Sequence, residues 1–422
     1  MTQAETVSAK TAPAQRCRHC GAELRTVLAN LGASPVANDF LDPARLGRAE
    51  PFYPLEVLVC SNCRLAQTHD VLGADDIFRD DYVYFSSHST TWLEHARAYV
   101  ERMIARFGVG PGQRWVEIAS NDGYLLKNVK GAGIPALGVE PCRSVAEVAI
   151  AKGIDTRIEF FGVECARRLA AEGWAADVIT ANNVFAHVPF INDFAGGVAA
   201  LLKPEGVATI EVQHLLRLMQ RNQFDTIYFE HFSYLSLIAG MKIFESVGLR
   251  VFDVEEPSTH GGSIRFFLCH KGAAHAQTEN VARVLNEELA YGLDKDATYE
   301  AWAERVRETK RALLALLIGL KREGKTIAAY GAPAKGVTLL NYCGVGRDFI
   351  DFAVDRAPSK QNLLMPGVHI PVHAPEEIFA RKPDYVLILP WNLKGEIMAQ
   401  MAGIRAWGGR FIVPIPAPAI ID

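Results

Sequence analysis

The chain has 422 residues, of which 49% are hydrophobic and 22% are charged, as in globular proteins of two or three domains. Its 44 basic and 48 acidic side chains give a net charge of −4, which argues against nucleic-acid or anionic-membrane partners. No apolar run approaches the ~18 residues that span a bilayer, and residues 1–14 lack the apolar core of a signal peptide. We therefore expect a cytoplasmic protein with a short disordered N-terminal tail. With no heptads and no obvious apolar edge, the sequence leaves the oligomeric state open, a monomer being one alternative.

Two cysteine pairs near the N-terminus have the spacing of zinc knuckles: Cys17 and Cys20 in CRHC, and Cys60 and Cys63 in CSNC. Each pair places two thiolates on one tight turn, and two such turns complete the closed four-thiolate site of structural zinc. Two unrelated CxxC pairs or a redox pair are the alternatives, but a redox motif normally occurs once and beside a βαβ pattern. The sequence therefore predicts a structural Zn²⁺ site in a module over residues 1–80.

The segment from residue 114 to residue 140 reads as a strand, a turn, a helix and a second strand. The acidic and glycine positions of S-adenosylmethionine (SAM) enzymes correspond by residue type to Glu117, Ala119, Asn121 and Gly123. Glu140 ends the second strand, where Rossmann-like folds hydrogen-bond ribose hydroxyls, although an ordinary strand-end acid is the alternative. The first turn has no basic cluster for a pyrophosphate, which favours SAM over NAD.

Two further strands continue this SAM-binding domain, which we place at residues 81–275. The segments DVITANNVFAHV and LLKPEGVATIEV read as its fourth and fifth strands, with a helix between them. Asn182 and Asn183 end the fourth strand and are expected to face the cofactor, because ligands gather at that edge of open α/β sheets. His187 follows them and is a further candidate, with a packed or capping histidine as the alternative.

The segment YFEHFSYLS, residues 228–236, places Glu230 and His231 side by side among four aromatic residues. Adjacent side chains point in different directions, so the two are expected to serve different atoms of a substrate. The aromatic residues would exclude water and lower the local dielectric, which suits a neutral histidine acting as a general base. A helix cap with surface charges is the alternative.

Residues 276–422 are expected to form a second Rossmann-like domain, entered through a long amphipathic helix over 293–322. In the turn GAPAKG, a helix N-terminus and Lys335 together suit an anionic group. The segment HGGSIR is a second candidate for phosphate, because paired glycines let backbone amides approach a ligand closely. Ordinary tight turns are the alternative for both segments. An NAD-dependent oxidoreductase is a weaker hypothesis, since only Asp355 follows Gly331 at a suitable spacing.

Seven motifs in the same order resemble those of the SAM-dependent C-methyltransferases of bacterial deoxysugar biosynthesis. They are CRHC…CSNC, YVYFSSHS, VEIASNDGYLL, YFEHFSYLS, THGGSIRFF, YGAPAKGVTLLNYCG and LPWN. The resemblance implies an α/β protein with an N-terminal zinc-binding module, a central Rossmann-like class I methyltransferase domain and a C-terminal Rossmann-like domain. It also implies that a nucleotide-linked 4-keto-deoxysugar, carried on dTDP or a similar nucleotide, binds between them. Ala119 departs from the pattern, because the family more often has glycine there.

The resemblance also implies roles for individual residues. His231 would remove a proton beside the C4 ketone to give an enolate, which is then methylated at C3 or C5. The other catalytic candidates are Glu230, Tyr228, His187 and Tyr82. The candidate substrate contacts are Tyr84 (the rival of Tyr82), His260, Gly261, Gly262, Arg265, Lys335 and Asn392. A sugar O-methyltransferase and a non-catalytic, zinc-containing nucleotide-binding protein remain alternatives.

Overall fold

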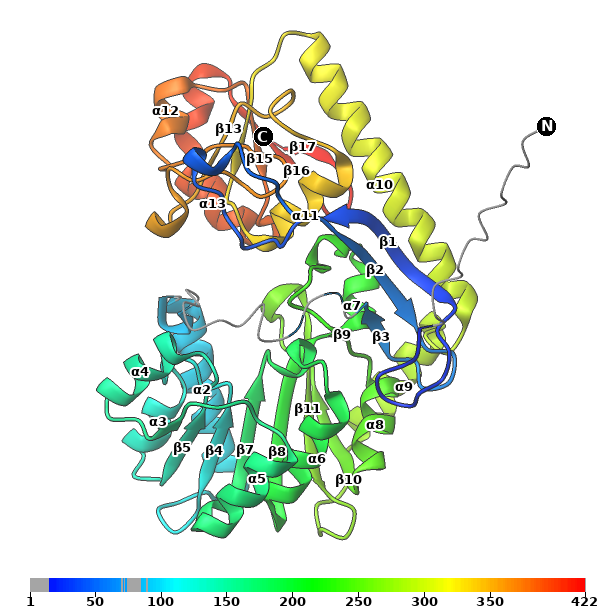
Figure 1. Cartoon of the computed structure of the whole chain (residues 1–422), viewed down its shortest axis with the longest axis vertical. Coiled ribbons are helices and arrows are strands. Elements are labelled where there is room, and N and C mark those ends of the chain that lie inside the picture. Colours follow the sequence, from blue (N-terminus) through cyan, green and yellow to red (C-terminus); the bar gives the residue numbers. More distant parts are fainter. Residues whose placement is uncertain (1–14, 70, 72, 74–84, 89, 422) are drawn as a thin grey trace, which may run out of the picture.

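The computed structural model describes residues 15–69, 71, 73, 85–88 and 90–421, and their strands form three sheets. Figure 1 shows the seven-stranded sheet in the lower half, the six-stranded sheet in the upper half, and a smaller sheet beside them. Within the described residues, none of the helices combines the length and apolar character that crossing a membrane requires. The fold is the α/β arrangement that the sequence predicts; the domain boundaries near residues 80 and 275 stay predictions.

The smaller sheet is antiparallel, and one of its strands comes from the middle of the chain. In order across the sheet, the strands are β1 (Thr26–Ser34), β2 (Tyr53–Val59), β3 (Ala66–Thr68) and β9 (Ser233–Tyr234). Leu28 and Val57 turn their buried side chains into the same core as Leu317 of the long helix α10 (Asp296–Arg322). The described residues of the N-terminal region therefore share their core with other parts of the chain, the C-terminal part at this face and the central sheet around Leu58 and Cys60.

The seven-stranded sheet has the order β10-β11-β8-β7-β4-β5-β6. It is parallel from β8 to β6, and at one edge β11 pairs antiparallel with both β8 and β10. Its strands are β4 (Trp115–Ile118), β5 (Ala136–Val139), β6 (Thr156–Arg157), β7 (Ala176–Asn182), β8 (Leu202–Gln213), β10 (Leu249–Glu255) and β11 (Ser263–His270). Its helices are α2 (Thr90–Phe107), α3 (Leu126–Gly131), α4 (Arg143–Ala151), α5 (Val163–Leu169), α6 (Ile191–Leu201), α7 (Leu215–Gln220) and α8 (Leu237–Ser246).

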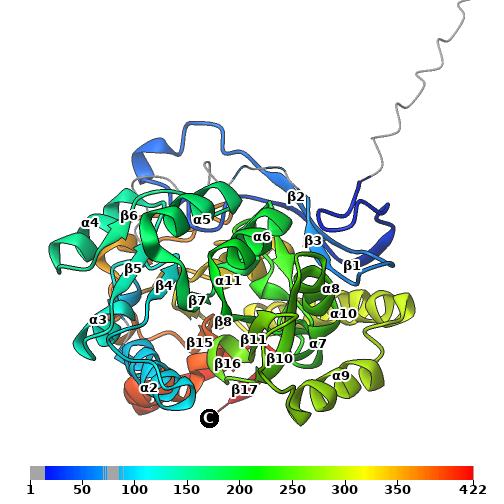
Figure 2. The same ribbon diagram turned by 90° about the horizontal axis from the view of Figure 1, so that it is seen from below.

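Alternating side chains of the parallel strands fill cores on both faces of this sheet. Trp115 packs with residues of α2 and α3, whereas the next residue, Val116, packs with residues of α5, α6 and α8. Figure 2 shows these two groups of helices on opposite sides of the strands. With both faces covered, the carboxyl edge of the sheet is the place where side chains and loops build a site.

The six-stranded sheet has the order β14-β13-β12-β15-β16-β17, parallel except for β17. Its strands are β12 (Ile327–Tyr330), β13 (Phe352–Val354), β14 (Val372–His373), β15 (Tyr385–Ile388), β16 (Arg410–Val413) and β17 (Ala419–Ile421). The helices of this region are α9 (Glu279–Tyr291), α10, α11 (Ala334–Cys343), α12 (Glu377–Arg381) and α13 (Lys394–Gln400). Helix α10 matches the connecting helix predicted over 293–322, and in Figure 1 it runs beside β1 from one half of the molecule to the other.

Short 3₁₀ segments and one short π-helix join these elements, and several carry residues of the site. They are η1 (Pro43–Arg45), η2 (Ser86–His88), η3 (Ala170–Trp174, the π-helix), η4 (Phe185–His187), η5 (Phe224–Thr226), η6 (Thr259–Gly261), η7 (Pro358–Lys360), η8 (Trp391–Leu393) and η9 (Ala402–Trp407).

Candidate active site

Four cysteine thiols converge in the N-terminal region. The Sγ atoms of Cys17, Cys20, Cys60 and Cys63 all lie within 4.8 Å of one another, and three of these residues are buried. The Sγ atoms of Cys17 and Cys63, and those of Cys20 and Cys60, are 3.5 Å apart. Tetrahedral zinc with bonds of about 2.3 Å needs sulfur–sulfur distances of about 3.8 Å, so these four thiols fit a structural Zn²⁺ ion.

The two cysteine turns close in the same way. The residue after each second cysteine, Gly21 or Arg64, has a positive φ of 72° or 68°. Its N–H donates to the carbonyl of the first cysteine, Cys17 or Cys60, at 2.9 or 2.8 Å. Each turn thereby brings its two thiols together, and the two turns meet at one site.

Most of the predicted SAM residues line a cavity of about 460 Å³ at the carboxyl edge of the seven-stranded sheet. Those in the lining are Ala119, Asn121, Glu140, Asn182 and Asn183. Three of them are non-glycine residues with positive φ: 56° at Ala119, 48° at Asn121 and 53° at Asn183. Such conformations cost of order 1–2 kcal/mol each, and they cluster where a chain is shaped around a ligand.

Glu140 holds the predicted SAM turn in place. Its Oε2 accepts a hydrogen bond from the N–H of Asn121, and its Oε1 accepts one from the N–H of Cys142, both at 2.9 Å. Gly123 also has positive φ, and an added Cβ there would lie 3.0 Å from Cγ1 of Ile154. The acid at the second strand end therefore orders the turn, with remaining lone pairs for a ligand.

Unpaired acceptors remain at this edge of the sheet. Both carboxylate oxygens of Glu117, and Oδ1 of Asn182, are buried without a hydrogen-bond partner among the described residues. Glu117 lies outside the cavity lining, and burial raises its pKa well above the ordinary value. Buried acceptors are normally satisfied, so the edge fits a ligand rich in donors, such as the ammonium, hydroxyl and amine groups of SAM.

His231 and His187 meet in the same cavity, with ring centroids 4.7 Å apart. Nδ1 of His231 lies 2.9 Å from the carbonyl oxygen of Thr226, and Nδ1 of His187 lies 2.6 Å from that of Glu230. A carbonyl oxygen only accepts hydrogen bonds, so each neutral ring carries its proton on Nδ1 and its lone pair on Nε2. The ring of Tyr228 lies 4.2 Å from that of His231, centroid to centroid.

Glu230 is nearly enclosed, with 5% of its surface exposed. Its Oε1 accepts a hydrogen bond from Nδ2 of Asn38 at 2.8 Å, while Oε2 is buried without a partner among the described residues. Burial raises the pKa of Glu230. The hydroxyl of Ser233, three residues on, is likewise buried, lines the cavity, and has no partner in the described part of the chain.

The C-terminal region supplies the opposite wall of the cavity through Pro333, Ala334, Lys335 and Lys360. Nζ of Lys335 donates to Oδ1 of Asn392 at 2.9 Å, and Nζ of Lys360 donates to the carbonyl of Ala332 at 2.8 Å. Burial lowers the pKa of both lysines. Helix α11 begins at this wall, and no side chain of the described residues caps its N-terminus, so two cations and a helix N-terminus face the same space.

Some of the predicted substrate contacts lie outside the cavity lining, and others cannot be placed in it. Tyr82 and Tyr84 lie outside the described residues, as does the side chain of His260. Asn392 lies behind Lys335, outside the lining. Arg265 is fully buried, pairs with Glu211 and Glu255, and lies 4.6 Å from the ring of Tyr99, so we leave it out of the proposed substrate contacts.

The paired glycines of HGGSIR also have a structural explanation. Gly261 and Gly262 have φ values of 87° and 120°. Added Cβ atoms would lie 2.7 Å from Nε2 of Gln223 and 2.9 Å from Cβ of Arg217. These glycines therefore allow close packing against helix α7 and the loop that follows it, and neither lines the cavity.

Three residues of the site were not predicted from the sequence. Asn38 reaches Glu230 from the N-terminal region, Thr226 accepts from His231, and Lys360 joins Lys335. Asn38 and Lys360 carry no local motif and arrive only through packing of distant segments. Thr226 stands five residues before His231, but no pattern marks its carbonyl as the acceptor.

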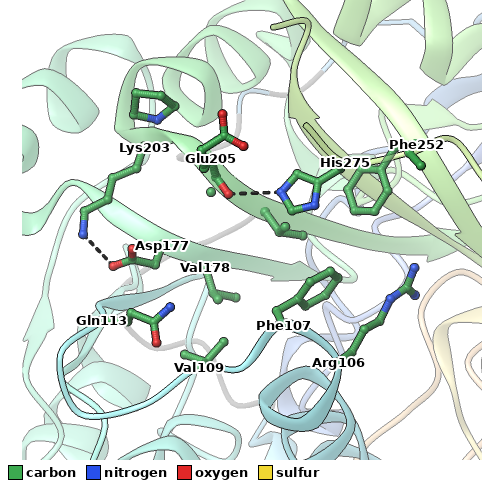
Figure 3. Close-up of a pocket in the computed structure, with 14 residues that line it drawn as sticks. Arg106, Phe107, Val109, Gln113, Asp177, Val178, Lys203, Glu205, Phe252 and His275 are labelled. Atoms are coloured by element: carbon green, nitrogen blue, oxygen red, sulfur yellow. Dashed lines mark hydrogen bonds and ion pairs between the residues drawn. The ribbon is translucent and has the colours of Figure 1, made fainter. Parts of the chain in front are cut away.

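A second and larger hollow, of about 750 Å³, lies at the amino ends of β7 and β8. Figure 3 shows Nζ of Lys203 bound to Asp177, at 2.6 Å, and Nε2 of His275 bound to the carbonyl of Glu205, at 3.1 Å. Arg106 pairs with Asp253 at 2.6 Å. Of the residues in this lining, none has a buried polar side-chain atom without a partner.

Comparisons with known proteins agree with this architecture. Three family models match consecutive parts of the chain: a "putative zinc binding domain" (17–78), a methyltransferase domain (92–254) and a C-methyltransferase C-terminal domain (258–416). C-methyltransferase NovU of Streptomyces niveus is 38% identical over 410 residues, which cover 97% of each chain.

Two solved structures each match less than half of this chain. Magnesium protoporphyrin IX methyltransferase (ChlM) of Synechocystis PCC 6803 is 16% identical, with a TM-score of 0.35 over 46% of this chain and 91% of that one. The PH0226 protein of Pyrococcus horikoshii OT3 is 16% identical, with a TM-score of 0.36 over 44% and 95%. Because the likeness to NovU spans nearly both full chains and includes all three parts, this chain belongs to the family of SAM-dependent, zinc-binding C-methyltransferases.

Proposed function

We propose that this enzyme methylates a carbon next to the C4 ketone of a nucleotide-linked 4-keto-deoxysugar, at C3 or C5. The supporting observation is one cavity in which two histidines, each with Nδ1 bound to a backbone carbonyl, face the SAM edge of the sheet. SAM, when bound, supplies an electrophilic methyl group on a positively charged sulfur. The remaining task of the protein is to create a carbon nucleophile and to hold it there.

His231 is the proposed base. A ketone acidifies the hydrogens on its neighbouring carbons, and Nε2 of the neutral His231 ring accepts one of these protons to leave an enolate. The Thr226 carbonyl holds the other ring nitrogen, which fixes the ring orientation and favours the resulting imidazolium. Tyr228 covers one side of the ring and excludes water from it.

Stabilising the enolate oxygen requires a donor. The Nδ1–H of His187 donates a hydrogen bond to the Glu230 carbonyl, so His187 donates to the enolate oxygen only when Nε2 is also protonated. Tyr82 is the second proposed donor, on the strength of the sequence alone. Glu230 is proposed to hold a polar substituent of the sugar through its unpartnered Oε2.

The pyrophosphate is proposed to bind at the C-terminal wall. Lys335 and Lys360 supply two positive charges, and the first amides of α11 add donors beside them. Burial disfavours both free cations, so a bound pyrophosphate would regain favourable charge pairing. The nucleotide would then extend from this wall, with the sugar reaching toward His231.

A direct test uses SAM labelled with ¹³C in its methyl group and a set of dTDP-linked 4-keto-6-deoxysugars. We expect two-dimensional NMR of the product to show the labelled methyl on ring carbon C3 or C5. A methyl on oxygen, or no transfer to any sugar of the set, would contradict the proposal.

A further inference from the structure

The N-terminal region is joined to the segment that carries the proposed base. Strand β3 begins three residues after Cys63 and pairs Gln67 with Ser233 of β9. At its end, the N–H of Thr68 donates to the carbonyl of Phe232 at 3.1 Å, and the Thr68 hydroxyl lies 3.2 Å from the carbonyl of His231. The backbone around His231 is therefore part of a sheet built mainly by the zinc-binding region.

The same region sends one side chain into the cavity. Asn38 lies between β1 and η1, and its Nδ2 donates to Oε1 of Glu230 at 2.8 Å. Both residues line the cavity, although 192 positions separate them in the chain. Asn38 is exposed, whereas Glu230 is only 5% exposed. The hydrogen bond therefore joins a surface residue of the N-terminal region to a buried residue of the cavity.

Glu230 needs such a support. A carboxylate with two rotatable bonds beyond Cβ can turn its oxygens in several directions, and burial removes the water that would otherwise satisfy them. An amide donor holds Oε1 without neutralising the charge, whereas an arginine or lysine would consume it in an ion pair. Oε2 is then the oxygen left for a ligand.

We propose that Asn38 is a positioning residue of the active site, which orients Glu230 so that Oε2 meets a polar group of the sugar. This inference rests on the proposed function, because it takes the sugar as the ligand of Glu230. The zinc-binding region then contributes directly to the geometry of the methyl-acceptor site, in addition to folding around its metal.

The test compares Asn38→Asp with Asn38→Ala in the full-length, zinc-loaded enzyme. Asn38→Asp keeps the size of the side chain but replaces the donor by an acceptor. We expect both variants to lose about 10- to 100-fold in kcat, the effect of losing one hydrogen bond to a charged group. The Kd for SAM by calorimetry and the zinc content by mass spectrometry should match the wild type, since Asn38 is neither a zinc ligand nor one of the proposed SAM-binding residues.

Asn30→Asp is the matched control. Asn30 lies in the same region and its Nδ2 donates to Oε1 of Glu56 at 2.7 Å, away from the cavity. We expect its kcat to stay within twofold of the wild type. Wild-type kcat in Asn38→Asp, or a loss in Asn38→Ala alone, would overturn the inference, because the donor would then be unnecessary. Failure of the proposed function would instead appear in the wild-type reaction itself.

Discussion

The two hollows of this molecule differ in size and, more importantly, in whether their polar side chains are paired. The larger one, at the amino ends of β7 and β8, is lined by charged groups that pair with one another, such as Lys203 with Asp177. The smaller one, at the carboxyl edge, retains buried polar atoms on Asn182, Glu230 and Ser233 that have no partner among the residues the structure describes. Buried polar groups are costly unless satisfied, so unpaired acceptors mark the hollow that is built for a ligand.

Backbone conformation separates the two hollows as well. Ala119, Asn121 and Asn183 have positive φ at the smaller hollow, whereas no lining residue of the larger hollow does. Strain of this kind persists only where the surrounding structure imposes it. A hollow formed by imperfect packing of loops needs neither strain nor unpaired groups. Four substitutions, each with a counterpart at the larger hollow, test this distinction.

The largest effect is expected at His231. His231→Gln removes the proposed base, and we expect kcat to fall by about 10²- to 10⁴-fold, the usual contribution of a general base. Its counterpart His275→Gln, at the larger hollow, should leave kcat within twofold. Steady-state methyl transfer with each purified variant measures both. Equal losses in the two variants would remove the functional distinction between the hollows.

The second effect concerns two aspartates with opposite pKa shifts. Burial raises the pKa of Asp225, beside the smaller hollow, to about 6 from the ordinary 3.8, with Lys335 opposing the shift. The protonated Asp225 carboxyl is favoured in the folded protein, so its contribution to stability is fully present below pH 4 and is lost as the pH rises through 6. The free energy of unfolding falls by about 3 kcal/mol over this range. Asp225→Asn should flatten the free energy of unfolding between pH 4 and 6, measured by urea denaturation.

Asp253, beside the larger hollow, is the counterpart. Burial opposes its ionisation, but hydrogen bonds from Thr278, Asn280 and Arg106 lower its pKa. Its contribution is thus present at neutral pH and is lost as the pH falls through the lowered pKa, so Asp253→Asn should destabilise the fold at pH 7. If both variants lost stability at pH 7 to the same extent, the assigned difference between the two sites would be incorrect.

The third effect concerns substrate affinity. Lys360→Gln removes one of the two cations at the C-terminal wall, and we expect KM for the sugar nucleotide to rise about 10- to 100-fold, because a charge-assisted hydrogen bond contributes about 1.5–3 kcal/mol. The Kd for SAM should not change. Lys203→Gln, at the larger hollow, should change neither constant. An unchanged KM in Lys360→Gln would place the pyrophosphate elsewhere.

The smallest effect is expected at Ala119. Its φ of 56° is unfavourable for alanine, so Ala119→Gly should raise the free energy of unfolding by up to about 1 kcal/mol. Ala276, at the larger hollow, is not among the residues with positive φ. Ala276→Gly should lower the free energy of unfolding by about 0.4–1 kcal/mol, through the greater entropy of the unfolded chain. Thermal denaturation of both variants measures these changes. If both substitutions changed the free energy of unfolding in the same direction, backbone strain at Ala119 would not be the cause.

The sequence was sufficient for features that local patterns encode. Three such patterns are found in the structure: the paired cysteines form one cluster, the segment around Asn121 is a turn after a strand, and the amphipathic segment is helix α10. The segment YFEHFSYLS also indicated His231 and Glu230 as candidate site residues, and both line one cavity in the structure.

Features that depend on packing between distant segments could not be predicted from the sequence. The pairing of β3 with β9 and the hydrogen bond from Asn38 to Glu230 join segments that lie more than 150 residues apart, and no local pattern encodes such a meeting. The phosphate hypothesis for HGGSIR illustrates a further difficulty: close packing against Gln223 and a ligand both favour glycine, so the sequence alone does not distinguish them, and the structure shows the packing.

The most direct test of the central claim, that His231 forms an enolate in the smaller hollow, is hydrogen exchange without methyl transfer. The enzyme would be incubated in heavy water with a dTDP-linked 4-keto-deoxysugar and no SAM, and the sugar would be read by NMR. We predict deuterium at one carbon beside the ketone, lost in His231→Gln and retained in His275→Gln. Exchange that persists in His231→Gln, or that never occurs with a sugar that the enzyme methylates, would contradict the claim.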